Sequence, residues 1–414
     1  MSAPFTSGLA AFGGTPRSAR TLHVGRPNVP DREAVLSRIG AALDRRWLSN
    51  DGPLVAEFEE TVAEMLGVRH CVAVSNATAG IALAARAVGL TGDVAVPAFT
   101  FVATAHALAW HGIHPVFCDI DRDTHQLDPA LVEPALTEST TGILAAHTWG
   151  RPGDVAALTE VARRNDLQLL FDAAPAFGAT VGDRYVGSFG RAEVVSFHAT
   201  KVVNAGEGGA LLTDDDEVAE RARTMRSFGF FDNDTVVALG TNAKMSELAA
   251  AMALASLESY PHFRDVNRRN FELYTAALAP VPGLAVLPYH QGGLANYNNV
   301  VIEVDAGLAG ITRDLVLQVM TAENVLVRRY FYPGCHRMEP YRSQRPPTAE
   351  DFPVTDLVAS RVLSLPTGTD IGPEDVALVC ELLAGLVEHG KQVTALAGRS
   401  GLRDPLTVRG SGRE

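Results

Sequence analysis

Short apolar runs alternate with helical stretches from residue 70 onward, and this alternation constrains the fold more than any other feature of the sequence. Helical stretches such as Gly80–Val88 and Val155–Arg164 lie between several of the runs. This pattern is typical of an α/β fold with a mainly parallel sheet buried on both faces. Ligands of such sheets gather at the carboxyl ends of the strands. The expected strands are Cys71–Val74, Val94–Val96, Val116–Cys118, Ile143–Ala146, Leu167–Phe171, Val194–Phe197 and Ala210–Leu212.

The length of the chain, 414 residues, allows one large and one smaller domain. We expect an extended, Gly/Pro-rich arm at residues 1–30, a large domain at 31–265, a small α/β domain at 266–397 and a disordered tail at 398–414. A helix is expected to begin near Asn50–Pro53, and a long helical region from Ser246 to Leu278 leads out of the large domain. The small domain should contain strands at Asn299–Val304 and Val325–Arg328.

Composition narrows the class of protein. The apolar fraction is 47% and the formal charge is −13, which argues against nucleic acid as a partner but allows an anionic small molecule in a locally positive pocket. Neither a signal-peptide pattern nor an apolar run of membrane-spanning length occurs, so we expect a cytoplasmic protein. The four cysteines have no C-x-x-C spacing, and no metal site is expected.

Two residues at the ends of neighbouring expected strands indicate a specific chemistry. Asp172 closes the run Leu167–Phe171, and Lys201 follows the next run by a few residues. Pyridoxal phosphate requires an amine that condenses with its aldehyde and a carboxylate that keeps its pyridine nitrogen protonated. A strand-end acid is costly to bury unless it is paired, and a protonated pyridine would be such a partner. A surface lysine and a turn aspartate are the alternative reading of these residues.

Two further strings would complete such a site. Ser75–Gly80 joins a strand to a helix with small residues, so its backbone amides and the helix N-terminus could hold a phosphate. Pro97–Thr104 carries two aromatic side chains in a loop, one of which could stack on a flat ring. A plain N-cap turn and ordinary core packing are the alternatives for these two strings.

The string Ser196-Phe197-His198-Ala199-Thr200-Lys201, with the following Glu207-Gly208-Gly209, resembles the DegT/StrS-type sugar aminotransferases. The resemblance covers roughly residues 20–390. It implies the aspartate aminotransferase-like fold (PLP-dependent fold type I) and a nucleotide-linked ketosugar as substrate. By this resemblance Lys201 matches the Schiff-base lysine and Asp172 the partner of the pyridine nitrogen. It further assigns the phosphate to Thr78, Ala79 and Ser196, ring stacking to Phe101, and the neighbouring subunit's phosphate to Asn242, which implies a homodimer with shared active sites.

One position departs from the family pattern. Many members carry Gln or His where this chain has Pro175, three residues after the aspartate. Proline cannot donate a hydrogen bond, so support of the cofactor ring must be apolar or come from another residue.

The C-terminal half indicates the substrate. Val327–His336 mixes cationic and aromatic side chains, which suit a diphosphate and a nucleobase, although a strand with a charged flank is the alternative. With the following string, His336–Tyr341, it resembles members that aminate C4 of a thymidine-diphosphate 4-keto-6-deoxyhexose, with L-glutamate as the amino donor. The candidate substrate residues are His198, Arg328, Arg329, Tyr330 and His336.

These observations predict a PLP-dependent aminotransferase of nucleotide sugars in deoxyaminosugar or antibiotic biosynthesis. A C3-acting sugar aminotransferase, another fold-type-I enzyme such as a lyase, and a PLP-binding regulator without turnover remain open as alternatives.

Overall fold

The computed structural model describes residues 5–289, 292–346, 348 and 350–400. All seven expected strands form one seven-stranded sheet in the order β2-β10-β9-β6-β5-β3-β4. Only β10 runs antiparallel to its neighbours, so the expected α/β fold with a mainly parallel sheet is confirmed. The strands are β2 His70–Val74, β3 Asp93–Pro97, β4 His114–Cys118, β5 Thr140–Ala146, β6 Gln168–Asp172, β9 Ala192–Ser196 and β10 Gly209–Thr213.

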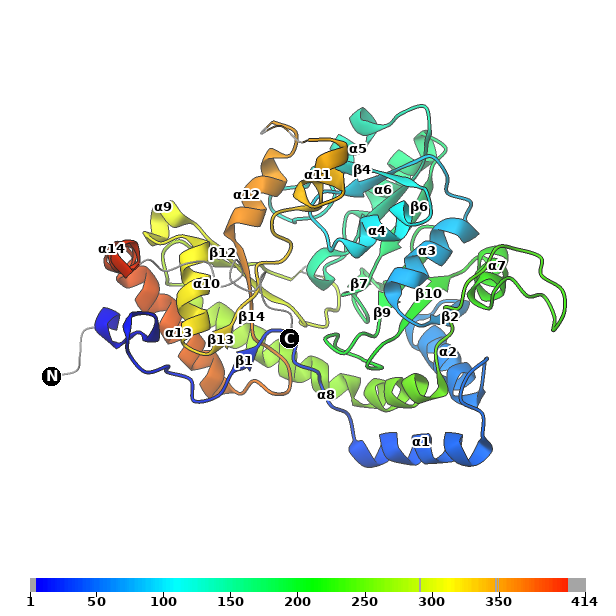
Figure 1. Cartoon of the computed structure of the whole chain (residues 1–414), viewed down its shortest axis with the longest axis horizontal. Coiled ribbons are helices and arrows are strands. Elements are labelled where there is room, and N and C mark those ends of the chain that lie inside the picture. Colours follow the sequence, from blue (N-terminus) through cyan, green and yellow to red (C-terminus); the bar gives the residue numbers. More distant parts are fainter. Residues whose placement is uncertain (1–4, 290–291, 347, 349, 401–414) are drawn as a thin grey trace.

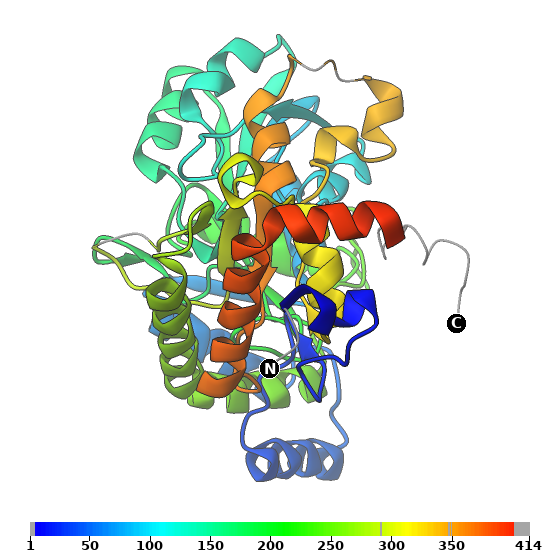
Figure 2. The same ribbon diagram turned by 90° about the vertical axis from the view of Figure 1, so that its left-hand side faces the viewer.

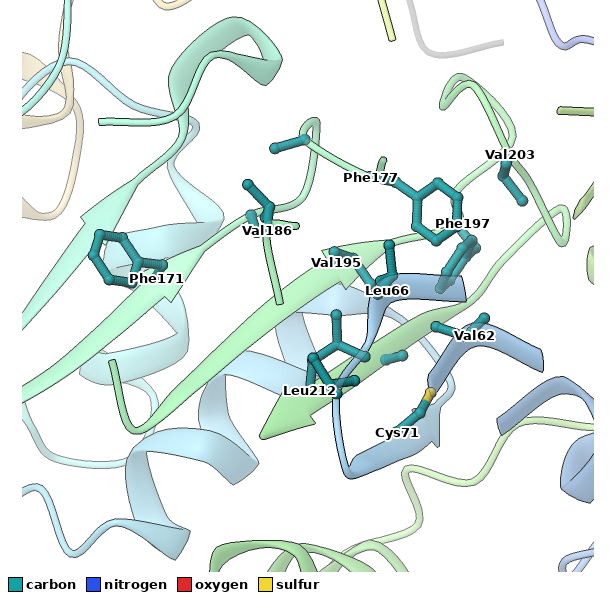
Figure 3. Close-up of a cluster of buried hydrophobic side chains, with 14 of the residues drawn as sticks. Val62, Leu66, Cys71, Phe171, Phe177, Val186, Val195, Phe197, Val203 and Leu212 are labelled. Carbon is teal, nitrogen blue, oxygen red and sulfur yellow. The ribbon is translucent and has the colours of Figure 1, made fainter. Parts of the chain in front are cut away.

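Helices cover both faces of this sheet. Side chains of α3 (Ala77–Ala87), α4 (Ala103–Ala109) and α7 (Asp216–Arg226) form one apolar layer with Val74 and Val194. On the other face, α2 (Pro53–Leu66), α6 (Val155–Arg164) and the start of α8 pack on Phe171, Val195 and Leu212, and Figure 3 shows part of this core. Burial on both faces explains why the strands are near-continuous apolar runs.

A single helix, α8 (Glu247–Leu278), links this sheet to a second, smaller core and runs across the lower part of the molecule in Figure 1. The smaller core contains a three-stranded antiparallel sheet in the order β11-β12-β14. Tyr274 near the end of α8 is fully buried there. The elements of this part are β11 Leu284–Val286, β12 Val300–Val304, α9 Ala306–Ala309, α10 Arg313–Ala322, β13 Val325–Leu326, α11 Tyr341–Gln344, α12 Pro353–Arg361, β14 Val362–Leu365, α13 Pro373–Glu388 and α14 Gly390–Ser400.

The N-terminal segment, expected to be an extended arm, packs against this second core. Leu9 and Leu22 are fully buried in it, and β1 (Leu22–His23) pairs in parallel with β13. The buried carboxylate of Glu323 accepts hydrogen bonds from the backbone amides of Ala10 (2.7 Å) and Arg17 (2.8 Å). Figures 1 and 2 both show this blue segment beside the red and orange C-terminal helices. Of the expected tail, residues 398–400 end α14, and 401–414 lie outside the described residues.

Helix α1 (Arg32–Arg45) had no sequence prediction of its own. It lies along α8 at the edge of the molecule, and Ala42 is its one buried residue. Short elements complete the chain: the 3-10 turns Phe5–Gly8, Ala10–Phe12, Glu133–Ala135, Thr148–Gly150 and Cys335–Arg337, helix α5 Pro129–Val132, and the hairpin β7 Thr180–Val181 with β8 Arg184–Tyr185.

Candidate active site

A cavity of about 850 Å³ lies at the carboxyl ends of the parallel strands. Segments far apart in sequence line it: the turn after β2, the loop after β3, the ends of β6 and β9, and, from the second core, the residues before β12, after β13 and after β14. Eight of the predicted site residues meet in this lining: Thr78, Phe101, Asp172, Ser196, His198, Lys201, Arg328 and Tyr330.

Asp172 ends strand β6 and is 6% exposed. One of its carboxylate oxygens accepts a hydrogen bond from the Thr104 hydroxyl at 2.7 Å, and the other accepts from the Ala174 amide at 3.1 Å. The Thr104 hydroxyl in turn lies 2.9 Å from that of Thr100. The carboxylate is therefore held in one orientation at the floor of the cavity.

Lys201 lies in the turn that follows β9, and its amide donates to the carbonyl of His198 at 2.9 Å. Burial lowers the pKa of the Lys201 amine below its usual value, while the nearby charge of Asp172 opposes this shift in part. A lysine of lowered pKa is neutral in a larger fraction of molecules near neutral pH, and only the neutral amine acts as nucleophile or base.

The N-terminus of α3 faces the same cavity. Asn76 caps this helix by accepting a hydrogen bond from the Ala79 amide at 2.9 Å, and Thr78 of the first turn lines the cavity. Strand β10 approaches the helix start closely, because a Cβ on Gly209 would lie 2.7 Å from the backbone nitrogen of Ala77. The exposed first turn of a helix is a favourable position for an anion.

Two further residues of the family motif also lie at the cavity. Ser196 is the last residue of β9, and its side chain accepts a hydrogen bond from the His198 amide at 3.2 Å. His198 lies one residue beyond the expected strand run, in the turn, with its ring nitrogen 2.9 Å from the Thr200 hydroxyl. Phe101 is 57% exposed, so its ring is available to a ligand.

Some predicted site residues are not brought to the cavity of this chain. Arg329 bonds to Asp314 at 3.0 Å and lies over the ring of Tyr332, and it is not part of the lining. The buried His336 pairs with Asp356 at 3.1 Å beside a separate crevice of about 50 Å³, and burial lowers its pKa. Ala79 is also outside the lining, and the exposed Asn242 pairs with Ser227 away from it. Arg329 and His336 lie beyond the end of β13 (Val325–Leu326). The alternation of side chains along a strand therefore does not apply to them, and the sequence did not show which way their side chains point.

Other lining residues have no counterpart in the sequence prediction. Val24, Arg26 and Asn28 reach the cavity from the N-terminal segment, where no periodicity reveals an element. His147 and Trp149 follow β5, and Asn298 precedes β12. Thr104, in the first turn of α4, bonds to Asp172 without being part of the lining; the two residues are 68 positions apart in the sequence, so no local pattern indicated this contact.

Pro175 lines the cavity as well. Its carbonyl accepts a hydrogen bond from the side chain of Asn296 at 2.9 Å, which fixes the turn after Asp172. The side chain at this position thus offers an apolar surface only.

Comparison with known proteins decides the family. The profile of the DegT/DnrJ/EryC1/StrS aminotransferase family matches residues 30–384. The chain belongs to this family. The predicted family and the predicted aminotransferase class are therefore confirmed.

The relatives share nearly the full length of the chain. The dTDP-4-amino-4,6-dideoxy-D-glucose transaminase of Escherichia coli is 33% identical over 368 residues, 88% of this chain and 99% of that protein. The GDP-perosamine synthase of Caulobacter vibrioides is 31% identical over 346 residues, 82% of this chain and 92% of that protein. The crystal structure of DesI in the presence of its TDP-sugar product is 51% identical, with a TM-score of 0.91, and covers 95% of this chain and 99% of that chain. The expected fold class is thereby shown as well.

Two negative findings apply to the part of the chain that the structure describes. No helix there is long and apolar enough to cross a membrane. The same residues contain no cluster of three or more His, Cys, Asp or Glu side chains suited to a metal ion. All four cysteines are buried and unpaired.

Proposed function

We propose that this protein is a pyridoxal-phosphate-dependent aminotransferase. We infer that it converts TDP-4-keto-6-deoxy-D-glucose to the 4-amino-4,6-dideoxy sugar nucleotide, with L-glutamate as amino donor. The observation that carries this proposal is the placement of the Lys201 amine and the Asp172 carboxylate in one cavity. The similarity to DesI and to the E. coli transaminase over nearly the whole chain supports the substrate.

The residues of the cavity fit pyridoxal phosphate. When bound, this cofactor supplies an aldehyde for condensation with amines and a ring that withdraws electrons once its nitrogen is protonated. Asp172 would hold the nitrogen, Lys201 the aldehyde, and Thr78, Ser196 and the start of α3 the phosphate. The exposed ring of Phe101 offers a stacking face. In the order of the sheet, β6 lies between β9 and β5, so the carboxylate is near the centre of the strand edge.

Lys201 then acts as the proton carrier of the reaction. When free, its neutral amine would take the proton from the α-carbon of the amino donor, hold it as an ammonium and return it to the carbon on the far side of the donor nitrogen. In the second half of the cycle it moves a proton in the reverse sense, at the sugar carbon that receives the amine. Both halves use one site, so ping-pong kinetics are expected.

We further propose a homodimer in which Asn242 completes the active site of the neighbouring subunit. Asn242 is exposed, and the adjoining loop presents a row of exposed apolar side chains that suits a protein partner. These side chains are Phe228, Phe230, Phe231, Val236, Val237 and Leu239. A cytoplasmic location and a role in antibiotic or other deoxysugar biosynthesis stay predictions.

The substrate is tested by incubation of the purified protein and pyridoxal phosphate with L-glutamate and TDP-4-keto-6-deoxy-D-glucose. NMR of the product should show the amine at C4. An amine at C3, or no reaction with a panel of 4-keto sugar nucleotides, would refute the substrate and leave the family membership standing.

A further inference from the structure

The N-terminal segment carries an arginine into the active-site cavity. Strands β1 and β13 pair in parallel, with His23 opposite Leu326, and the Val24 amide donates to the Leu326 carbonyl at 3.3 Å. Both chains leave this pair in the same direction. Arg26 follows one strand and Arg328 the other, and of the described residues that line the cavity these two alone are arginines.

The segment around Arg26 is bonded to the turn that carries Lys201. Asn28 is 2% exposed, its side chain donates to the Val202 carbonyl at 3.3 Å, and its own carbonyl accepts from the side chain of Asn204 at 2.8 Å. Gly25 lies so close to Thr200 that a Cβ there would be 3.1 Å from the Thr200 methyl carbon. The backbone at Arg26 thus lies beside the Lys201 turn, which is the reacting end of the cavity.

The two guanidinium groups are available to a ligand. Arg328 is exposed and has no ion-pair partner among the described residues. Arg26 pairs with Asp370 at 2.9 Å, but both side chains are partly exposed, so this pair contributes little. Arg20 also holds Asp370, at 2.8 Å, and would continue to do so if Arg26 turned toward the cavity.

The acidic residues of the lining do not neutralise these arginines. Asp172 is occupied by Thr104 and the Ala174 amide. Glu207 is exposed, and its carboxylate lies 3.7 Å from the ring of His198. Two arginines that no carboxylate of the cavity lining neutralises are suited to an oxyanion, which they can bind through charge-assisted hydrogen bonds.

We propose that Arg26 and Arg328 form an oxyanion subsite that holds the carboxylate of the amino donor. This inference rests on the proposed transamination. In an α-amino acid the carboxylate is attached to the same carbon as the reacting nitrogen, whereas in a 4-keto sugar nucleotide the diphosphate leaves from the far side of the hexose ring. An arginine beside the Lys201 turn therefore matches the carboxylate better than the diphosphate.

The test compares Arg26→Gln, Arg328→Gln and the conservative Arg26→Lys with the wild type, in two arms. In the first arm, the absorbance of the bound cofactor is titrated with L-glutamate in the absence of sugar. In the second arm, calorimetry measures the binding of TDP. Each glutamine variant should weaken the apparent affinity for glutamate about tenfold or more, with TDP affinity unchanged, and Arg26→Lys should restore part of the loss.

Asp370→Asn is the matched control. It removes the ion pair of Arg26 and retains the guanidinium, so it should leave glutamate affinity intact. If Arg26 only ties the segment to Asp370, this control will reproduce the loss and overturn the inference. A loss confined to TDP would assign the subsite to the diphosphate and overturn the carboxylate assignment, and unchanged affinities in both arms would overturn the subsite. A wild-type protein that binds TDP but shows no spectral response to pyridoxal phosphate and glutamate would instead contradict the proposed function.

Discussion

At the scale of single residues, the lysine assignment gives the sharpest prediction. The chain contains only three lysines, Lys201, Lys244 and Lys391. Lys201→Ala should abolish turnover, and borohydride reduction of the wild-type protein with pyridoxal phosphate should label the Lys201 peptide alone. Lys244→Ala is the control, since its amine lies 4.5 Å from the ring centre of Phe228, outside the cavity. A label on the Lys244 peptide would contradict the assignment.

The same lysine has a pH signature. Because burial lowers its pKa, the cofactor-free protein should contain neutral Lys201 amine at lower pH than an ordinary lysine does. Labelling with an excess of acetic anhydride across a pH series, followed by peptide mapping, should show the reactivity of Lys201 rising with pH around a midpoint below the usual lysine value. A midpoint at or above that value would show that the charge of Asp172 outweighs burial.

Asp172→Asn should bind pyridoxal phosphate and lose most activity. The amide keeps the shape of the carboxylate and can still accept from Thr104, but it cannot hold a proton on the pyridine nitrogen electrostatically. We expect a fall in kcat of at least about a hundredfold, the lower range for loss of one electrostatic catalytic contact. Steady-state kinetics with a spectral check of cofactor content measure it, and near wild-type turnover would reject the role of Asp172.

At the scale of elements, the strands were predictable and the segments around them were not. Apart from the edge strand β4, the strands of the large sheet are buried on both faces, so their apolar runs are visible in the sequence without knowledge of their neighbours. Helix α1 buries only Ala42, and the N-terminal segment is anchored by isolated residues such as Leu9 and Leu22. Neither has a periodic pattern, which is why Arg26 and Asn28 were missed. The family motif located the residues near Lys201, while the direction of Arg329 and His336 depends on contacts with Asp314 and Asp356.

Glu193 of strand β9 forms a buried pair that the sequence did not reveal. Glu193 and His147 are both fully buried, with 3.0 Å between their side chains, and Glu193 also accepts from the amides of Gly187 and Phe189. Glu193→Ala should therefore leave the His147 ring and the amides of Gly187 and Phe189 without their acceptor. We expect this to destabilise the protein by about 3–5 kcal/mol. Chemical denaturation measures this, with the exposed Glu160→Ala as control, for which little change in the free energy of unfolding is expected. An equal effect of both substitutions would refute the structural role of the pair.

At the scale of the whole molecule, the proposed dimer makes each active site depend on two chains. Lys201→Ala and Asn242→Ala proteins should each be inactive alone. In a mixed dimer, one site carries both lesions and the other carries neither, because Lys201 comes from one chain and Asn242 from its partner. After subunit exchange of equal amounts, half of the dimers are mixed and half of their sites intact, so about a quarter of the wild-type activity should return. Light scattering checks the assembly. The control is a mixture of Lys201→Ala and Asp172→Asn proteins. Because each chain supplies both Lys201 and Asp172 to its own cavity, each site of a mixed dimer carries one lesion and no site is intact. Recovery in the control mixture, or full activity of a monomer, would contradict the shared site.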